Sequence, residues 1–258
     1  MAPDEASPVR PGKTNSDKQR LIFSNPAVRT NGAMPLLVKI CGLKTPDALD
    51  VALEAGADMV GFVFFPPSPR NLGVEAARAL GEQVKGRARK VALSVDANDA
   101  QLDRIVEALK PDMMQLHGRE SPERVAAVRS RFRLPVMKAL PIETRTDLSP
   151  IHLYAKVADW LLFDARAPRE ATRPGGLGKI FDWSLLENIA LGVPFMLSGG
   201  LDAGNVAEAL RITGAPAVDV SSGVERAPGE KDPDKIRAFV RAARLADSAQ
   251  AAKLASTA

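Results

Sequence analysis

The first regular unit of this chain lies in residues 36–46, which read LLVKICGLKTP. The apolar run Leu36–Ile40 predicts a short buried strand. Thr45 followed by Pro46 predicts the start of a helix, because threonine caps helices and proline is favoured in their first turn. Cys41, the only cysteine of the chain, stands between the two. A strand that ends in a reactive side chain and leads into a helix is typical of α/β barrels, whose catalytic residues lie at strand ends.

The same alternation continues along the chain. Further strands are expected at Met59–Phe64, Lys90–Val95, Met113–Leu116, Pro135–Ala139, Trp160–Phe163, Phe195–Leu197 and Ala217–Val220. Helices are expected at Pro46–Ala55, Val74–Gln83, Asp99–Leu109, Pro122–Arg131, Asn205–Arg211 and Pro233–Ala246, with weaker patterns at Leu148–Ala155 and Ser184–Asn188. Eight such units in about 220 residues match the size of a single (β/α)8 TIM barrel.

A doubly wound open sheet is the structural alternative. That fold usually carries G-x-G-x-x-G after its first strand, whereas residues 41–45 read CGLKT and no Walker A sequence is present. The barrel is therefore favoured. We expect residues 35–248 to form the barrel domain, residues 1–34 to be a disordered extension and residues 249–258 to be a flexible tail. Met34 is an alternative translation start.

Composition excludes several classes of function. The formal charge of +4 arises from 35 basic and 31 acidic side chains, which gives no basic face for nucleic acid. The apolar cluster of the extension, Leu21–Phe23, is too short for a signal peptide or membrane span. One cysteine and two histidines argue against disulfides and metal sites, so we expect a cytoplasmic protein without a metal ion. Both a monomer and a homodimer remain open.

Two glycine-rich turns follow the last two strands. Residues 198–201 read SGGL and residues 221–224 read SSGV. In α/β barrels these two loops often hold a phosphate, and glycine lets the backbone approach the anion closely. Tight strand-to-helix turns also use glycine for structural reasons. The pair nevertheless favours a phosphorylated small-molecule substrate, contacted by Gly199, Gly200, Ser222 and Gly223.

The chain after Met34 resembles the phosphoribosylanthranilate isomerase family of tryptophan biosynthesis. The motifs that carry the resemblance are VKICG at 38–42, GFVF at 61–64, SPR at 68–70, QLHG at 115–118, FD at 163–164, FDW at 181–183, SGGL at 198–201 and VDVSSGVE at 218–225. Any one of them is weak, but their joint order and spacing are highly specific. The resemblance implies a cofactor-free Amadori rearrangement, in which an aminoaldose becomes an aminoketose.

The resemblance also implies the two catalytic residues. Asp164 matches the general acid that protonates the ring oxygen of the substrate, and Cys41 matches the general base that removes a proton from the adjacent sugar carbon. A free cysteine has a pKa of about 8.5, so Cys41 needs a neighbour that stabilises its thiolate. Lys39 and the helix beginning at Pro46 are the two candidates. Because Lys39 and Asp219 both point inward on adjacent strands, we expect a buried ion pair between them.

Two further side chains are candidates for binding. Arg70 follows a proline-rich loop, and the resemblance implies that it binds the anthranilate carboxylate, a role that suits a guanidinium group. A surface arginine is the plain alternative. His117 either contacts the substrate or bonds a loop carbonyl.

The loop after the sixth strand departs from the family. Residues 175–178 read GGLG, with leucine where family members commonly have threonine or serine, so that hydroxyl is lost while Gly176 and Gly178 keep their backbone N–H groups. Three basic residues precede this run, at Arg166, Arg169 and Arg173. They suit either a mobile flap over an anion or a solvated basic loop.

Two rival functions are open at this point. One is another phosphosugar isomerase or lyase on the same barrel, such as the histidine-pathway aminoaldose isomerase, which uses a pair of aspartates. Cysteine rather than aspartate at the first strand argues against it. The other is a catalytically silent barrel that binds a phosphorylated metabolite. The presence of both Cys41 and Asp164 argues against that.

Overall fold

The computed structural model describes residues 35–168 and 170–255; the extension predicted at residues 1–34 and Arg169 lie outside these ranges. The barrel strands are β1 (Leu37–Cys41), β2 (Met59–Phe64), β3 (Arg89–Ser94), β4 (Met113–Leu116), β5 (Val136–Ile142), β6 (Trp160–Ala165), β7 (Phe195–Leu197) and β8 (Ala217–Val220). Each pairs in parallel with the next and β8 pairs with β1, which closes the sheet. The predicted TIM barrel is confirmed.

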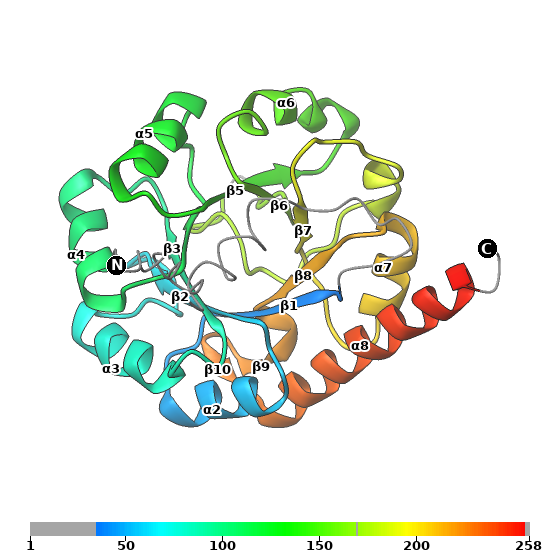
Figure 1. Ribbon diagram of the computed structural model, residues 1–258, viewed down its shortest axis with the longest axis horizontal. Coiled ribbons are helices and arrows are strands. Elements are labelled where there is room, and N and C mark those ends of the chain that lie inside the picture. Colours follow the sequence, from blue (N-terminus) through cyan, green and yellow to red (C-terminus); the bar gives the residue numbers. More distant parts are fainter. Residues whose placement is uncertain (1–34, 169, 256–258) are drawn as a thin grey trace, which may run out of the picture.

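Helices surround this sheet (Figure 1). They are α2 (Pro46–Glu54), α3 (Val74–Val84), α4 (Asp99–Leu109), α5 (Pro122–Phe132), α6 (Ile151–Tyr154), α7 (Val206–Thr213) and α8 (Pro233–Ala255). The cap predicted at Thr45 is present, since its hydroxyl accepts a hydrogen bond from the Ala48 N–H at 3.3 Å. Ser121 caps α5 in the same way, accepting a hydrogen bond from the Arg124 N–H at 3.3 Å.

Two predicted helices are wrong in form. The segment expected at Leu148–Ala155 divides into the 3-10 turn η1 (Arg145–Leu148) and the single-turn α6. Pro150 separates them, because proline lacks the N–H that a continuous helix requires. The segment expected at Ser184–Asn188 is the 3-10 turn η2 (Trp183–Leu186). Asn188 has a φ of 56°, which lies outside helical geometry.

The C-terminal part also differs from expectation. After β8 the chain forms the 3-10 turn η3 (Ser222–Val224) and an unpredicted hairpin of β9 (Glu225–Ala227) and β10 (Glu230–Lys231). Helix α8 continues to Ala255 rather than ending at Ala246 and projects beyond the barrel in Figure 1. Its last part is rich in alanine and contains no glycine or proline, so nothing in the sequence ends it.

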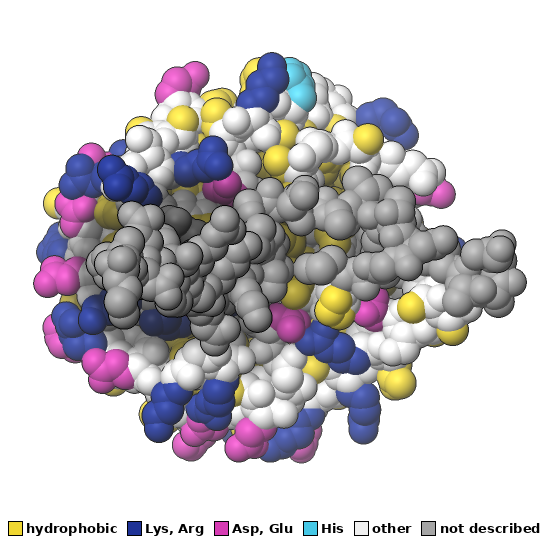
Figure 2. Space-filling view, in the orientation of Figure 1, with side chains coloured by type: hydrophobic (Ala, Val, Ile, Leu, Met, Phe, Trp, Pro, Cys, Tyr) yellow, Lys and Arg dark blue, Asp and Glu magenta, His cyan; other side chains and the backbone are white. Residues whose placement is uncertain are grey.

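Charged side chains of both signs are interspersed around the rim in Figure 2. Several join neighbouring helices, such as Arg131 to Asp103 at 2.7 Å. Exposed pairs of this kind contribute little each. Within residues 35–168 and 170–255, no helix is both long and apolar enough to span a bilayer.

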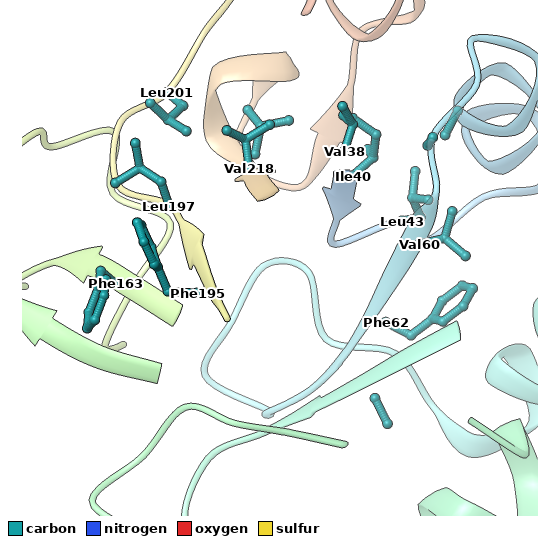
Figure 3. Close-up of a cluster of buried hydrophobic side chains, with 14 of the residues drawn as sticks. Val38, Ile40, Leu43, Val60, Phe62, Phe163, Phe195, Leu197, Leu201 and Val218 are labelled. Carbon is teal, nitrogen blue, oxygen red and sulfur yellow. The ribbon is translucent and has the colours of Figure 1, made fainter. Parts of the chain in front are cut away.

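Strand residues of opposite parity build two separate cores. Outward-facing side chains such as Val38, Phe62 and Phe163 pack in a large buried cluster (Figure 3). Inward-facing side chains fill the lower barrel, a layer rich in methionine that contains Met59, Met113, Met137 and Met196. Nearer the carboxyl ends of the strands, Cys41 packs with Val63 and Leu93. This filled interior places the functional side chains at the mouth of the barrel.

Candidate active site

A single pocket at the carboxyl ends of the strands collects the predicted site residues. All of them except Gly223 line it: Cys41, Arg70, His117, Asp164, Gly176, Gly178, Gly199, Gly200 and Ser222. A Cβ at Gly223 would lie 1.9 Å from the Leu201 carbonyl oxygen. Gly223 therefore lets the two glycine-rich turns at residues 198–201 and 221–224 pack together. Within the described part of the chain, no three His, Cys, Asp or Glu side chains form a group that could hold a metal ion.

Cys41 is the last residue of β1 and is 3% exposed. Gly61, its register partner on β2, makes room for it, because a Cβ at that position would lie 2.8 Å from the Cys41 sulfur. Burial raises the pKa of the Cys41 thiol, and the positive charge of Lys39 opposes this rise. Before substrate binds, the thiol form is therefore favoured, with the ammonium group of Lys39 and, less strongly, that of Lys231 placed to stabilise the thiolate.

The predicted pair of Lys39 and Asp219 is confirmed. The two residues are register partners on β1 and β8, and the Lys39 ammonium donates to Asp219 Oδ1 at 2.8 Å. Lys39 also lies within side-chain hydrogen-bonding reach of Cys41. Burial lowers the pKa of Lys39, but Asp219 and Cys41 outweigh it and the net change is upward. Lys39 therefore stays charged directly beside the thiol.

Asp164 lies in β6 with His117 beside it. Its Oδ1 accepts the Ala165 N–H at 2.9 Å, and its Oδ2 lies 3.3 Å from His117 Nε2. On the other side of the imidazole, the Gln115 amide nitrogen lies 3.0 Å from His117 Nδ1. With the amide assigned in this orientation, Gln115 donates to Nδ1 and the imidazole proton lies on Nε2, facing Asp164. His117 is therefore bonded to side chains rather than to a loop carbonyl.

The turn after β7 presents free backbone donors. Gly199 and Gly200 have positive φ values of 87° and 63°, which glycine adopts without strain. Neither of their N–H groups donates to another residue in the described ranges. A Cβ at Gly199 would lie 2.6 Å from the Ala165 nitrogen, so glycine also lets this turn pack against β6. Free N–H groups at this edge suit an anion.

Arg70 is buried, not a surface residue, and is held by an acidic partner. Its Nε and Nη2 donate to the two carboxylate oxygens of Glu225, each at 2.7 Å. Lys231 donates to the same carboxylate at 2.8 Å. Burial raises the pKa of Glu225, but Arg70 and Lys231 outweigh it and lower the pKa overall. The β9–β10 hairpin thus fixes the Arg70 guanidinium at the pocket.

The loop after β6 lies across this pocket through its glycines. Added Cβ atoms would fall 2.4 Å from Asp164 Oδ2 at Gly175 and 2.4 Å from Arg70 Nη1 at Gly176. The Gly176 carbonyl accepts a hydrogen bond from Arg70 Nη2 at 3.1 Å. Leu177 and Gly178 line the pocket next to them. The absence of side chains at the two glycines lets the loop close on the acid and the arginine together.

Comparison with known proteins agrees with this geometry. The family model for N-(5'-phosphoribosyl)anthranilate (PRA) isomerase matches residues 38–242. The chain belongs to the PRA isomerase family. It is an isomerase of tryptophan biosynthesis. The N-(5'-phosphoribosyl)anthranilate isomerase of Bradyrhizobium sp. strain ORS 278 is 65% identical over 214 residues, which are 83% of this chain and 98% of that protein.

Solved structures of isomerases share the fold. The phosphoribosyl anthranilate isomerase of Thermotoga maritima has a TM-score of 0.73 and 34% identity, over 81% of this chain and 99% of that one. A phosphoribosyl anthranilate isomerase in complex with reduced 1-(o-carboxyphenylamino)-1-deoxyribulose 5-phosphate has a TM-score of 0.71 and 31% identity over the same shares.

Sequence reasoning assigned no role to several residues that shape this site. Gly61 begins the GFVF motif and Gly175 begins the GGLG run, but neither glycine was given a function. Glu225 lies in a family motif but was given no function. Lys231 lies in a hairpin that was not predicted. The run APGE at 227–230, a turn-like sequence between charged residues, was the available signal for that hairpin.

Proposed function

We propose that Cys41 and Asp164 are the catalytic base and acid of this isomerase, acting on N-(5'-phosphoribosyl)anthranilate. The observation that supports this is their joint position in one pocket, with a buried ammonium beside the thiol and an imidazole beside the carboxyl group. Acid and base groups in unlike environments are a common arrangement for proton transfer.

The reaction begins with two proton transfers and ends with ketonisation. Asp164 gives a proton to the ring oxygen of the ribose, the bond between that oxygen and the anomeric carbon breaks, and the anilino nitrogen forms a protonated Schiff base. The Cys41 thiolate then takes the proton from the adjacent carbon, which leaves an enolamine, a Cys41 thiol and an Asp164 carboxylate. Ketonisation adds a proton to carbon 1 and removes the enol O–H proton, so that the aminoketose forms while the thiol returns its proton and the carboxylate regains one. Lys39 stabilises the thiolate before this step, while His117 and Gln115 orient Asp164. These reaction steps need neither a metal ion nor a cofactor.

The remaining pocket residues bind and orient the substrate. Gly199, Gly200 and Ser222 supply donors for the phosphate, with Gly223 shaping their turn and Gly178 facing Ser222 across it. A Cβ at Gly178 would lie 3.8 Å from the Ser222 hydroxyl. The apolar wall of Val63, Phe65, Leu93 and Val95 suits the aromatic ring. Arg70 lies near this ring, where it contacts the carboxylate.

Turnover of freshly made substrate tests the two catalytic roles. Cys41→Ala and Asp164→Asn should each lower kcat by about 100-fold or more, the usual scale of general acid or base catalysis. The loss of substrate fluorescence, corrected for spontaneous breakdown, gives the rate. A variant that keeps near-wild-type turnover removes its residue from the mechanism.

Two cellular properties follow as proposals. A single thiol and a phosphorylated substrate are consistent with the cytoplasm. The protein acts as a monomer or a homodimer, and light scattering after size exclusion distinguishes the two.

A further inference from the structure

Arg173 lies at the edge of this pocket, and no hydrogen bond or ion pair joins its side chain to another residue within 35–168 and 170–255. It lines the pocket beside Arg70, yet its Nε is buried and has no hydrogen-bond partner among the described residues. Arg166, in the same loop, behaves differently, because it pairs with Asp147 and Glu143. Burial lowers the pKa of Arg173 and the Arg70 charge lowers it further, while Glu225 opposes both. An unsatisfied buried donor carries a cost in free energy, so this one is suited to an anion that binds there.

Arg70 alone cannot bind a carboxylate in the bidentate manner. A guanidinium group has five N–H donors. Nε and one N–H of Nη2 are occupied by Glu225, and the second N–H of Nη2 is occupied by the Gly176 carbonyl. Only the two N–H groups of Nη1 remain. Each two-nitrogen edge of Arg70 includes Nη2, so both edges are already used.

The surrounding side chains indicate which anionic group of the substrate binds Arg173 and Nη1 of Arg70. The phosphate donors lie on the turns after β7 and β8, at Gly199, Gly200 and Ser222. Arg173 instead extends the pocket toward Val95 and His117, and it lines the adjoining hollow with them. An aromatic ring against the apolar wall would carry its carboxylate on this side.

We propose that Arg173 determines specificity by binding the ring carboxylate of the substrate together with Nη1 of Arg70. This inference rests on the proposed function. Charge-assisted bonds from two guanidinium groups supply the donors that Arg70 by itself lacks. Because Arg173 belongs to the loop that contains Gly175 and Gly176, carboxylate binding also favours the loop position in which these glycines cover Asp164 and Arg70.

Calorimetric binding of two ligands tests the proposal. The first is reduced 1-(o-carboxyphenylamino)-1-deoxyribulose 5-phosphate, and the second is the same compound without its ring carboxylate. Arg173→Met should raise the Kd of the first by about ten- to 100-fold, as expected for lost charge-assisted hydrogen bonds, and leave that of the second unchanged. Arg173→Lys, which keeps the charge but loses the fork, should give an intermediate loss.

The matched control is Arg145→Met, which removes an exposed positive charge that does not line the pocket. It should change neither Kd. An equal loss for both ligands in Arg173→Met would overturn the proposal, as would an unchanged Kd for the carboxylated ligand. Because both measurements are of binding, they remain valid even if Cys41→Ala or Asp164→Asn retains turnover and the catalytic roles fail.

Discussion

Two buried lysines in this protein have nearly the same ion-pair geometry and opposite pKa shifts. Inside the barrel, Lys39 lies 2.8 Å from Asp219, and outside it, Lys138 lies 2.7 Å from Glu120. All four side chains are almost fully buried. Burial lowers the pKa of both lysines, yet the net shift is upward for Lys39 and downward for Lys138.

The difference comes from their remaining neighbours. Lys39 hydrogen-bonds Asp219 and has a second acidic group, the Cys41 thiol, within hydrogen-bonding reach. Lys138 hydrogen-bonds one carboxylate, and its other acceptors are the carbonyl oxygens of Leu116 and Gly118. The charge of Asp96 also raises the pKa of Lys138, but Asp96 makes no hydrogen bond to it. A second acidic group within hydrogen-bonding reach stabilises a lysine as a cation more strongly and is stabilised in return. Lys39 is thus placed to support a thiolate, whereas Lys138 holds the loop after β4.

The largest expected effect is on folding and is common to both pairs. Lys39→Met and Lys138→Met each leave a buried carboxylate without its partner, which should lower the free energy of unfolding by about 3–5 kcal/mol. Urea titration measures this change. The double variants Lys39→Met/Asp219→Asn and Lys138→Met/Glu120→Gln, which remove both charges, should recover part of the loss. A negligible loss in either single variant would show that its pair is not buried in solution.

The two lysine pairs should differ in their effect on kcat/KM. At neutral pH, Lys39→Met/Asp219→Asn should lose kcat/KM, since Lys39 lowers the thiol pKa by more than Asp219 raises it and the thiolate fraction falls as that pKa rises. Lys138→Met/Glu120→Gln should lose much less, because its partners lie in a supporting loop. Steady-state assays on folded protein compare them. Equal losses would contradict the distinction between the two pairs.

The pH dependence has a defined direction. The pKa of Cys41 is raised, so at neutral pH the base is mostly a thiol, and kcat/KM should rise as the pH increases toward that pKa. Removing the Lys39 charge should move this rising limb to higher pH, whereas removing the Lys138 charge should leave it in place. A profile that is flat over this range would argue against a thiolate base.

A smaller effect on kcat is expected when the space beside the Cys41 thiol is filled. Gly61→Ala places a methyl group where it must displace the Cys41 sulfur, with the Lys39 side chain 3.2 Å from the new atom. We expect about a tenfold loss of kcat, because small displacements of a catalytic group are costly. Gly73→Ala is the control, since no atom lies within 4 Å of its added Cβ. Equal activity in both variants would show that the sulfur tolerates displacement.

The sequence predicts those parts of the molecule that depend on local periodicity. Side chains alternate along a strand, so the facing of Lys39 and Asp219 follows from parity alone once the barrel closes. Lys138 points outward from an apolar strand, whereas Lys39 points inward, and nothing in the local sequence indicates that Lys138 reaches Glu120. The Arg70–Glu225 contact joins residues far apart in the sequence, and Glu225 begins a hairpin that was not predicted. Such contacts are set by tertiary packing, which a single sequence does not display.

The most direct test is titration of the Cys41 thiol itself. Because the chain has one cysteine, the ultraviolet thiolate absorbance of the protein minus that of Cys41→Ser reports this group alone. The Lys39→Met/Asp219→Asn variant should show a higher thiol pKa than the wild type, because Lys39 lowers this pKa through both its charge and its hydrogen bond, whereas Asp219 raises it through its charge alone. Lys138→Met/Glu120→Gln should show the wild-type value. A thiol pKa that is the same in all three proteins would contradict the claim that Lys39 lowers the thiol pKa by more than Asp219 raises it.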